Sequence, residues 1–248
     1  MRGFWGGFRH WRNAAATGFA VLALAACGEA KPAGEAAVPD AKAAMLAVFP
    51  DAKNGEVAIP ASAGAPARFE RPVTVIPGDA GNIYLVTAKE MEDGCHACAA
   101  SISVYYLKDA NGALSLSAPY RDLYESGGWG KPGEIKALTL PRNGGVGMTD
   151  ESGFTGQGCT AVNVSAYRFD ADGPRRILEG APLSRGQDDR IDVSGKIIKP
   201  YTADSDFAVA YSGNDNSVPV DTTVMWALDD GVLKQSSGRI PDAVAQGC

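Results

Sequence analysis

The chain has 248 residues and a formal net charge of −6, from 29 acidic and 23 basic residues. This acidic balance argues against DNA, RNA and anionic lipid surfaces as partners, because each of these binds through a basic patch. The 30 glycines and 15 prolines indicate many tight turns, which are more typical of an all-β fold than of a helical one.

The first 26 residues are organised like an export signal. Three arginines precede an apolar stretch over residues 14–26 that is too short to span a bilayer. The stretch closes in Leu24-Ala25-Ala26-Cys27. In this motif the segment resembles the bacterial lipoprotein class, whose signals end in a leucine, two small residues and a cysteine. The alternative is an ordinary secretory signal beside a coincidental cysteine.

The resemblance implies a lipid anchor. Residues 1–26 would be removed. Cys27 would then carry a diacylglycerol thioether and an acylated amine, with fatty acids such as palmitate. This covalent lipid is the one prosthetic group that we expect. In this class an aspartate directly after the cysteine marks retention in the inner membrane, but here Gly28 follows Cys27. The absence of the aspartate favours the outer membrane, with the domain facing the periplasm. Two or three acyl chains anchor a protein stably. The mature chain would have 20 basic and 29 acidic residues, a net charge of −9.

Residues 27–50 are predicted to hold the lipidated cysteine, a flexible tether and one short helix. The tether is rich in Ala, Glu, Lys, Gly and Pro and has no apolar pattern. Asp40 is a suitable cap for a helix over residues 41–49, with Met45, Leu46 and Phe49 on one face, and Pro50 stops it. Residues 51–71 are predicted to be a loop within a single β-rich periplasmic domain, 51–248.

Strand signals begin at about residue 72. Short β-branched or aromatic runs are bounded by Gly and Pro, and residues 101–107 alternate. Further strands are expected at 73–75, 83–86, 135–140, 145–149, 191–198, 207–211 and 218–224. Turn sequences that follow an aromatic strand recur near residues 111, 172 and 230. The recurrence has two possible origins: duplication of a meander, or independent use of the same residues in hairpin turns. The predicted fold is an all-β, antiparallel sandwich, barrel or propeller-like meander with one short N-terminal helix.

Four cysteines remain besides Cys27. An even number in an oxidising periplasm indicates two disulfides, for which three pairings exist. We favour Cys95–Cys98, whose members are close in sequence, and Cys159–Cys248, which closes a long loop. The chain-entropy model gives the long bridge about 4–5 kcal/mol at most.

The motif Cys95-His96-Ala97-Cys98 is the one cluster that points to chemistry, and His96 is the only histidine after the signal. Three interpretations compete. Its spacing matches thiol–disulfide exchange proteins, although a strand rather than a helix is predicted to follow. Two thiolates and an imidazole, from Cys95, His96 and Cys98, suit Cu(I) or Zn(II), but no second pair completes the site. The third interpretation is a structural disulfide loop.

The segment 120–129 is a possible recognition surface. Tyr120, Tyr124 and Trp129 lie in or beside a glycine-rich loop, where exposed aromatic side chains stack on sugars or anchor a partner protein. The alternative is that they pack over the sheet edge. Neither a nucleotide-binding glycine loop nor a nucleophile elbow is present in the sequence.

Together these features predict a lipid-anchored cell-envelope protein with a non-enzymatic binding or structural role, held together by disulfides. Its partners would be the membrane, through the anchor on Cys27, and an envelope protein or glycan. The alternative is a thiol-redox or Cu/Zn-handling protein that uses Cys95, His96 and Cys98. The two differ in whether these cysteines form a bridge that resists mild reductant.

Overall fold

The structure is a computed structural model that describes residues 38–142 and 145–248. The export signal, the Leu24-Ala25-Ala26-Cys27 motif and most of the tether lie outside the described residues. The described residues belong to one compact unit, Ala36–Cys248. Among them, no helix has the length and apolar character needed to cross a membrane.

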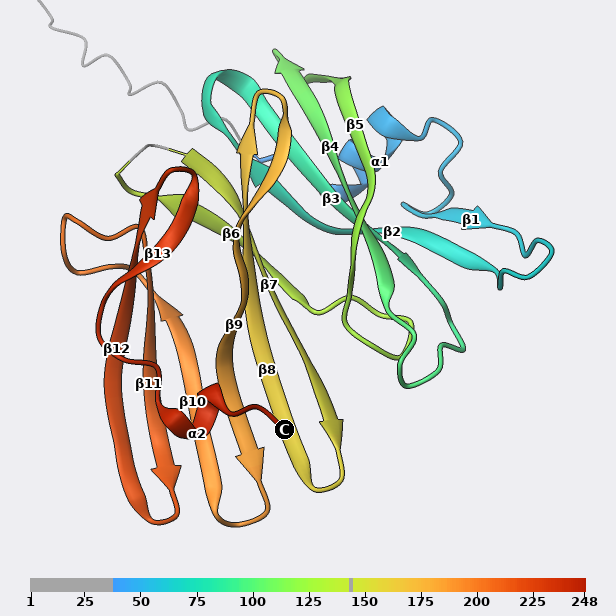
Figure 1. Ribbon diagram of the computed structural model, residues 1–248. Helices are drawn as coiled ribbons and strands as arrows, with labels where there is room; N and C mark the ends of the chain where they lie inside the picture. The colour runs from blue at the N-terminus through green and yellow to red at the C-terminus, as the bar shows by residue number, and fades with distance from the viewer. Residues whose placement is uncertain (1–37, 143–144) are drawn as a thin grey trace, which may run out of the picture. The chain divides into compact units, whose positions relative to one another are not determined.

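In residues 38–142 and 145–248, thirteen strands form two antiparallel sheets, and within each sheet strands that are consecutive in sequence pair with each other (Figure 1). The first sheet contains β1 (Val57–Ile59), β2 (Arg68–Pro77), β3 (Asn82–Glu90), β4 (Ala100–Ala110) and β5 (Ala113–Ser126). The second contains β6 (Glu134–Leu140), β7 (Gly145–Gly156), β8 (Cys159–Asp170), β9 (Gly173–Gln187), β10 (Ile191–Ile198), β11 (Phe207–Asp215), β12 (Val218–Asp229) and β13 (Val232–Ser237). The second sheet curves into a half-barrel, so the predicted all-β, sandwich-like fold is confirmed.

The three recurring turn sequences each close a hairpin. They join β4 to β5, β8 to β9 and β12 to β13, the first in one sheet and the other two in the second. Asn111 and Asp230 adopt positive φ at their turns, each followed by a glycine that does the same. Such turns fit the right-handed twist of the flanking strands. They require residues that adopt positive φ readily, and these residues can be recognised in the sequence.

The predicted helix is present as α1 (Ala41–Val48), capped by the Asp40 side chain, which accepts a hydrogen bond of 2.7 Å from the Ala43 N–H. Met45 is fully buried and packs with Leu85 and Tyr105 on the outer face of the first sheet. Leu46, predicted on the same face, is 40% exposed, so that part of the prediction is wrong.

Two short helical segments were not predicted: the 3-10 turn η1 (Asp79–Gly81) and α2 (Asp242–Ala245). Neither is long enough to show helical periodicity in a sequence.

The expectation of a loop over residues 51–71 is also wrong, since β1 and the start of β2 lie there. Charged residues at the start of β2 hide its strand character. Glu70 is only 4% exposed, yet its carboxylate accepts hydrogen bonds from the Thr87 hydroxyl, at 2.8 Å, and from the Tyr105 hydroxyl, at 2.7 Å. A buried carboxylate that accepts two hydrogen bonds is tolerated inside a sheet, because these bonds offset part of the cost of its burial.

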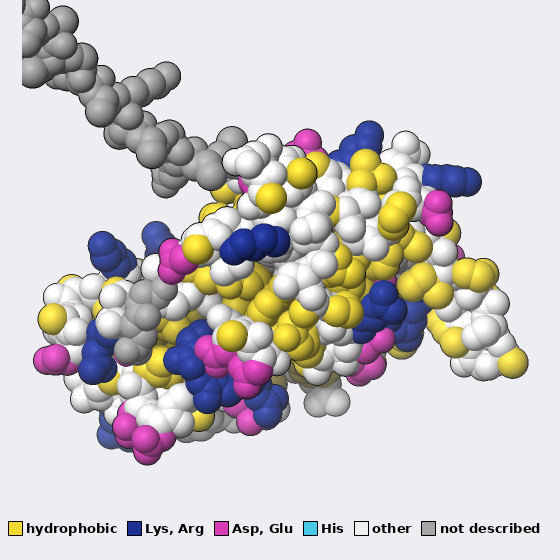
Figure 2. Space-filling view, turned by 90° about the horizontal axis from the view of Figure 1, so that it is seen from above, with side chains coloured by type: hydrophobic (Ala, Val, Ile, Leu, Met, Phe, Trp, Pro, Cys, Tyr) yellow, Lys and Arg dark blue, Asp and Glu magenta, His cyan; other side chains and the backbone are white. Residues whose placement is uncertain are grey.

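The sheets pack on each other through one apolar cluster. Val86 and Ile102 of the first sheet meet Met148, Tyr167 and Phe169 of the second. The other face of the half-barrel holds a second cluster around Phe207, Trp226 and Val244 of α2. On the face seen in Figure 2, Lys and Arg side chains are interspersed with Asp and Glu around exposed apolar side chains.

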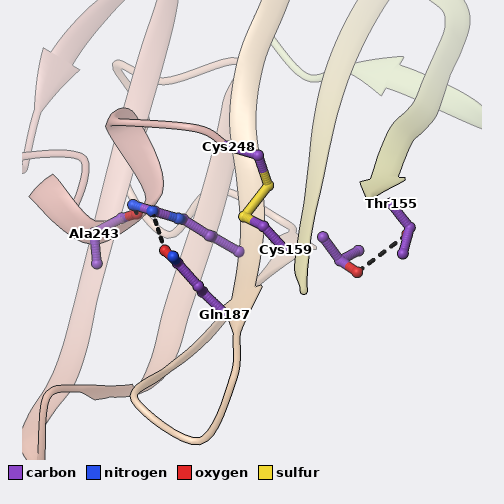
Figure 3. Close-up of a disulfide and its surroundings, with 7 residues drawn as sticks. Thr155, Cys159, Gln187, Ala243 and Cys248 are labelled. Atoms are coloured by element: carbon purple, nitrogen blue, oxygen red, sulfur yellow. Dashed lines mark hydrogen bonds between the residues drawn. A yellow bond between two sulfur atoms is a disulfide. The ribbon is translucent and has the colours of Figure 1, made fainter. Parts of the chain in front are cut away.

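The C-terminus is fixed to the half-barrel by the disulfide Cys159–Cys248, whose sulfurs join residues 89 positions apart in sequence (Figure 3). The Arg185 guanidinium donates a hydrogen bond of 3.0 Å to the Ala243 carbonyl oxygen and also contacts the Gln187 side chain. Val244 is 2% exposed. The pairing favoured from the sequence is confirmed for this bridge.

Candidate functional site

The connection between β3 and β4, residues 91–99, is a tight disulfide loop. Cys95 and Cys98 are bonded, with their Cα atoms 4.9 Å apart, and the Cys98 N–H donates a hydrogen bond of 2.8 Å to the Cys95 carbonyl oxygen. Cys95 and His96 are exposed. The loop leads directly into β4, so the cysteines precede a strand, as predicted, and not a helix N-terminus of the kind that lowers a thiol pKa.

The connection between β5 and β6, residues 127–133, is hydrogen-bonded to this disulfide loop. The Gly130 N–H donates to the Cys98 carbonyl oxygen at 2.7 Å, and the Met91 N–H donates to the Gly130 carbonyl oxygen at 3.0 Å. The Trp129 N–H donates to the His96 carbonyl oxygen at 3.4 Å. The two loops therefore form one hydrogen-bonded unit.

Glycine is required where these loops meet. A Cβ atom on Gly94 would lie 2.4 Å from the Gly130 nitrogen, and one on Gly130 would lie 2.6 Å from the Met91 carbonyl oxygen. Gly130 also has φ of +72°, which glycine adopts at little cost. The glycine-rich sequence around Trp129 thus reflects close approach of two backbones.

Three aromatic side chains meet on the surface above these loops. His96, Trp129 and Phe154, here called the aromatic cluster, come from the disulfide loop, the β5–β6 loop and β7. The ring centroids of His96 and Trp129 are 4.9 Å apart with planes tilted by 40°, and those of His96 and Phe154 are 5.9 Å apart with a tilt of 31°. Trp129 is 62% exposed and Phe154 is 58% exposed.

The backbone of Trp129 is in the left-handed region, with φ of +55°. For a bulky side chain this conformation costs about 1–2 kcal/mol. The neighbouring hydrogen bonds impose the conformation, and the result is a large apolar ring held in solvent. Strain of this kind gathers at binding and catalytic sites.

The tyrosines of the predicted recognition surface behave differently from Trp129. Tyr124 stacks on Tyr167, with centroids 4.5 Å apart and planes 10° apart, and Tyr120 packs edge-on against Tyr106 at 4.9 Å. Packing over the sheet is therefore the correct interpretation for both tyrosines, while Trp129 is exposed. Phe154 was missed, because only the packing of the two sheets brings the far end of β7 beside the disulfide loop.

A groove of about 470 Å³ lies beside the aromatic cluster, with Phe154 in its wall. The polar and charged side chains of its lining are Ser126, Ser152, Asn163 and Glu125, and no Lys or Arg is among the described residues that line it. One ring of the aromatic cluster, that of Phe154, therefore shares the groove with hydrogen-bonding side chains, while His96 and Trp129 lie outside its lining.

A buried carboxylate fixes the β5–β6 loop from below. The Ser126 hydroxyl donates a hydrogen bond of 2.8 Å to Asp150 of β7 and accepts one of 3.0 Å from the Gly133 N–H. Asp150 is only 3% exposed, and this burial raises the pKa of its carboxyl. The Ser126 hydroxyl thereby joins the two ends of the loop to each other and ties them to β7.

A network of charged side chains connects the β5–β6 loop to the end of β3. Glu90, at the end of β3, accepts hydrogen bonds from the Arg71 guanidinium at 3.1 Å and from the Lys131 ammonium at 2.5 Å. Arg71 also pairs with Glu56 at 2.7 Å. Isolated surface ion pairs contribute little to stability, but a shared partner restricts the positions of all the members.

The proposed metal ligands Cys95, His96 and Cys98 are close together, but the two sulfurs are bonded to each other and the imidazole packs against Trp129 and Phe154. Across residues 38–142 and 145–248, no group of three or more His, Cys, Asp and Glu side chains is arranged to hold a metal ion. Comparisons of the chain with protein family models, curated proteins and solved structures give no match.

Proposed function

We propose that this chain is a lipid-anchored cell-envelope protein with a non-enzymatic binding role, and that the aromatic cluster is its binding surface. The observation that carries the proposal is the position of Trp129, a 62% exposed indole on a left-handed backbone. Large aromatic side chains dominate the energetics of binding surfaces. A ring that is already held in place loses little conformational entropy when a ligand arrives.

The anchor and the compartment are inferred from the sequence and agree with the chemistry of the fold. The Leu24-Ala25-Ala26-Cys27 motif implies lipid attachment at Cys27, with the domain facing the periplasm from the outer membrane. Two disulfides support an oxidising compartment, since such bridges are rare in the reducing cytosol.

One observation favours the alternative of a thiol-redox or Cu/Zn-handling protein: Cys95 is exposed, so its bridge to Cys98 is accessible to a reductant. Peptide mapping separates the two proposals, with free thiols alkylated during purification from the periplasm. Complete Cys95–Cys98 and Cys159–Cys248 bridges support a structural disulfide. Alkylated Cys95 and Cys98 beside an intact Cys159–Cys248 bridge would instead support the alternative.

The binding role is tested with a photo-crosslinking amino acid at Ala97, an exposed position inside the disulfide loop. The full chain is irradiated in the cell envelope, and adducts are separated by size. We expect an adduct that is lost when Trp129→Ala is added. A crosslinker at Tyr201, which is 68% exposed between β10 and β11, is the matched control. Absence of an adduct at Ala97, or an adduct unaffected by Trp129→Ala, would contradict a binding role for the aromatic cluster.

A further inference from the structure

We propose that the groove beside the aromatic cluster binds an oligosaccharide without acidic groups, with the aromatic rings stacking against the sugar faces. The inference rests on the proposed binding function and names the ligand class. Three properties of the groove lead to it: its size, the combination of an aromatic ring with hydrogen-bonding side chains in its lining, and its charge.

The size of the groove favours a narrow ligand over a folded partner. A volume of about 470 Å³ lies within the range of small-molecule sites, roughly 300–1,000 Å³. A protein interface instead requires on the order of 800 Å² of complementary surface on each partner. The groove is open to solvent, so part of a chain-like ligand can enter it while the rest stays outside.

The aromatic rings suit the flat face of a sugar ring. Aromatic faces carry negative partial charge, and the C–H bonds on one face of a pyranose point towards such a ring. Phe154 lines the groove, and the ring centroid of His96 lies 5.9 Å from that of Phe154 and 4.9 Å from that of Trp129, outside the lining. A ligand that stacks on Phe154 in the groove can therefore continue over His96 towards the exposed Trp129.

The polar side chains suit the hydroxyl groups at the edge of the same sugar ring. Ser152 offers a hydroxyl that donates and accepts, and Asn163 offers an amide that does both. Both side chains are solvent-accessible. A ligand with an apolar face and hydroxyl-bearing edges matches this combination, whereas a purely apolar ligand would leave these groups without partners.

The charge of the groove excludes acidic sugars. Glu125 is the charged side chain on the wall, and no Lys or Arg lines the groove among the residues that the structure describes. The mature chain is acidic as well. A uronic acid or phosphate group would meet a carboxylate without a compensating cation, so electrostatics favours an uncharged or amino sugar.

The test is isothermal titration calorimetry of the full chain in detergent micelles, with chitotetraose and cellotetraose as neutral probes and tetragalacturonic acid as the acidic probe. We expect binding of a neutral probe and none of the acidic one. Trp129→Ala should weaken the binding by about tenfold or more, as truncation of an aromatic hot spot does. Asn163→Ala should weaken it less, and Tyr201→Ala should leave it unchanged.

Circular dichroism and thermal unfolding show whether each variant is folded. Binding of the acidic probe as tightly as the neutral ones, or neutral binding that survives Trp129→Ala in a folded variant, overturns the assignment. Failure of both neutral probes, together with a Trp129-dependent protein adduct at Ala97, overturns the saccharide while the binding function stands. Failure of both probes without such an adduct removes both proposals.

Discussion

The two disulfides close loops of very different length, and this difference predicts different contributions to stability. Cys159 and Cys248 are 89 positions apart, whereas Cys95 and Cys98 are 3 apart. The chain-entropy relation, applied to closed loops of about 90 and about 4 residues, gives roughly 4.6 and roughly 1.9 kcal/mol at 25 °C. The long bridge should therefore stabilise the fold by more than twice as much as the short one.

The perturbation is a pair of double variants, Cys159→Ala with Cys248→Ala and Cys95→Ala with Cys98→Ala. Urea unfolding followed by far-ultraviolet circular dichroism gives the free energy of unfolding of each. We expect a loss of about 4 to 5 kcal/mol for the first pair and about 2 kcal/mol for the second. The second pair should retain the fold but lose ligand binding, because the disulfide loop holds His96 and the backbone of Trp129.

The reasoning fails if the two double variants lose equal stability, or if removal of the short bridge costs more. Either result would mean that native contacts, and not the entropy of the unfolded chain, set the contribution of the bridges. A small effect of the long bridge alone would point to the other contacts of the C-terminus. These are the Arg185–Ala243 hydrogen bond and the burial of Val244.

Three further predictions concern the parts that hold the fold. Burial raises the pKa of the Asp150 carboxyl above its unfolded value of about 4. The protonated carboxyl therefore contributes its full share to folded-state stability below about pH 4, and this contribution is lost as the pH rises through the raised pKa. Asp150→Asn should flatten the dependence of stability on pH and increase the unfolding free energy at pH 7, measured by urea titrations from pH 4 to 7; an unchanged slope would contradict this. Arg185→Met removes the donor to the Ala243 carbonyl oxygen and should cost about 1–3 kcal/mol, with faster amide exchange confined to residues 242–246. Met45→Ala, at a fully buried position of α1, should lower the stability measured by thermal unfolding by about 2–5 kcal/mol, whereas Leu46→Ala at its exposed neighbour should lower it by less than about 1 kcal/mol.

Local chemistry explains why much of the fold could be predicted from the sequence. The hairpin turns at Asn111 and Asp230 need residues that tolerate positive φ, and those residues are visible in a sequence. The strands between them alternate or carry β-branched residues. The start of β2 was missed because Glu70 is charged, and only the donors Thr87 and Tyr105, from other strands, make its burial acceptable.

The candidate site could be predicted only in part, for a related reason. Cys95, His96 and Trp129 were singled out because their residue types and glycine-rich surroundings are unusual. Their proximity arises from backbone hydrogen bonds between two loops more than thirty residues apart in sequence, which no local pattern encodes. Phe154 had no signal, since a lone phenylalanine at a strand end is usually a packing residue.

The place of the aromatic cluster in the topology gives it a further property. The chain passes from the first sheet to the second once, through the β5–β6 loop that carries Trp129. His96 lies in the loop that joins β3 and β4 of the first sheet, and Phe154 lies in β7 of the second, so a ligand in contact with both bridges the two. Binding energy at the cluster then favours the arrangement in which the sheets are packed, since a ligand stabilises the state that binds it. The Ser126–Asp150 hydrogen bond already ties this crossing to β7, so the free protein presents the cluster assembled before any ligand binds.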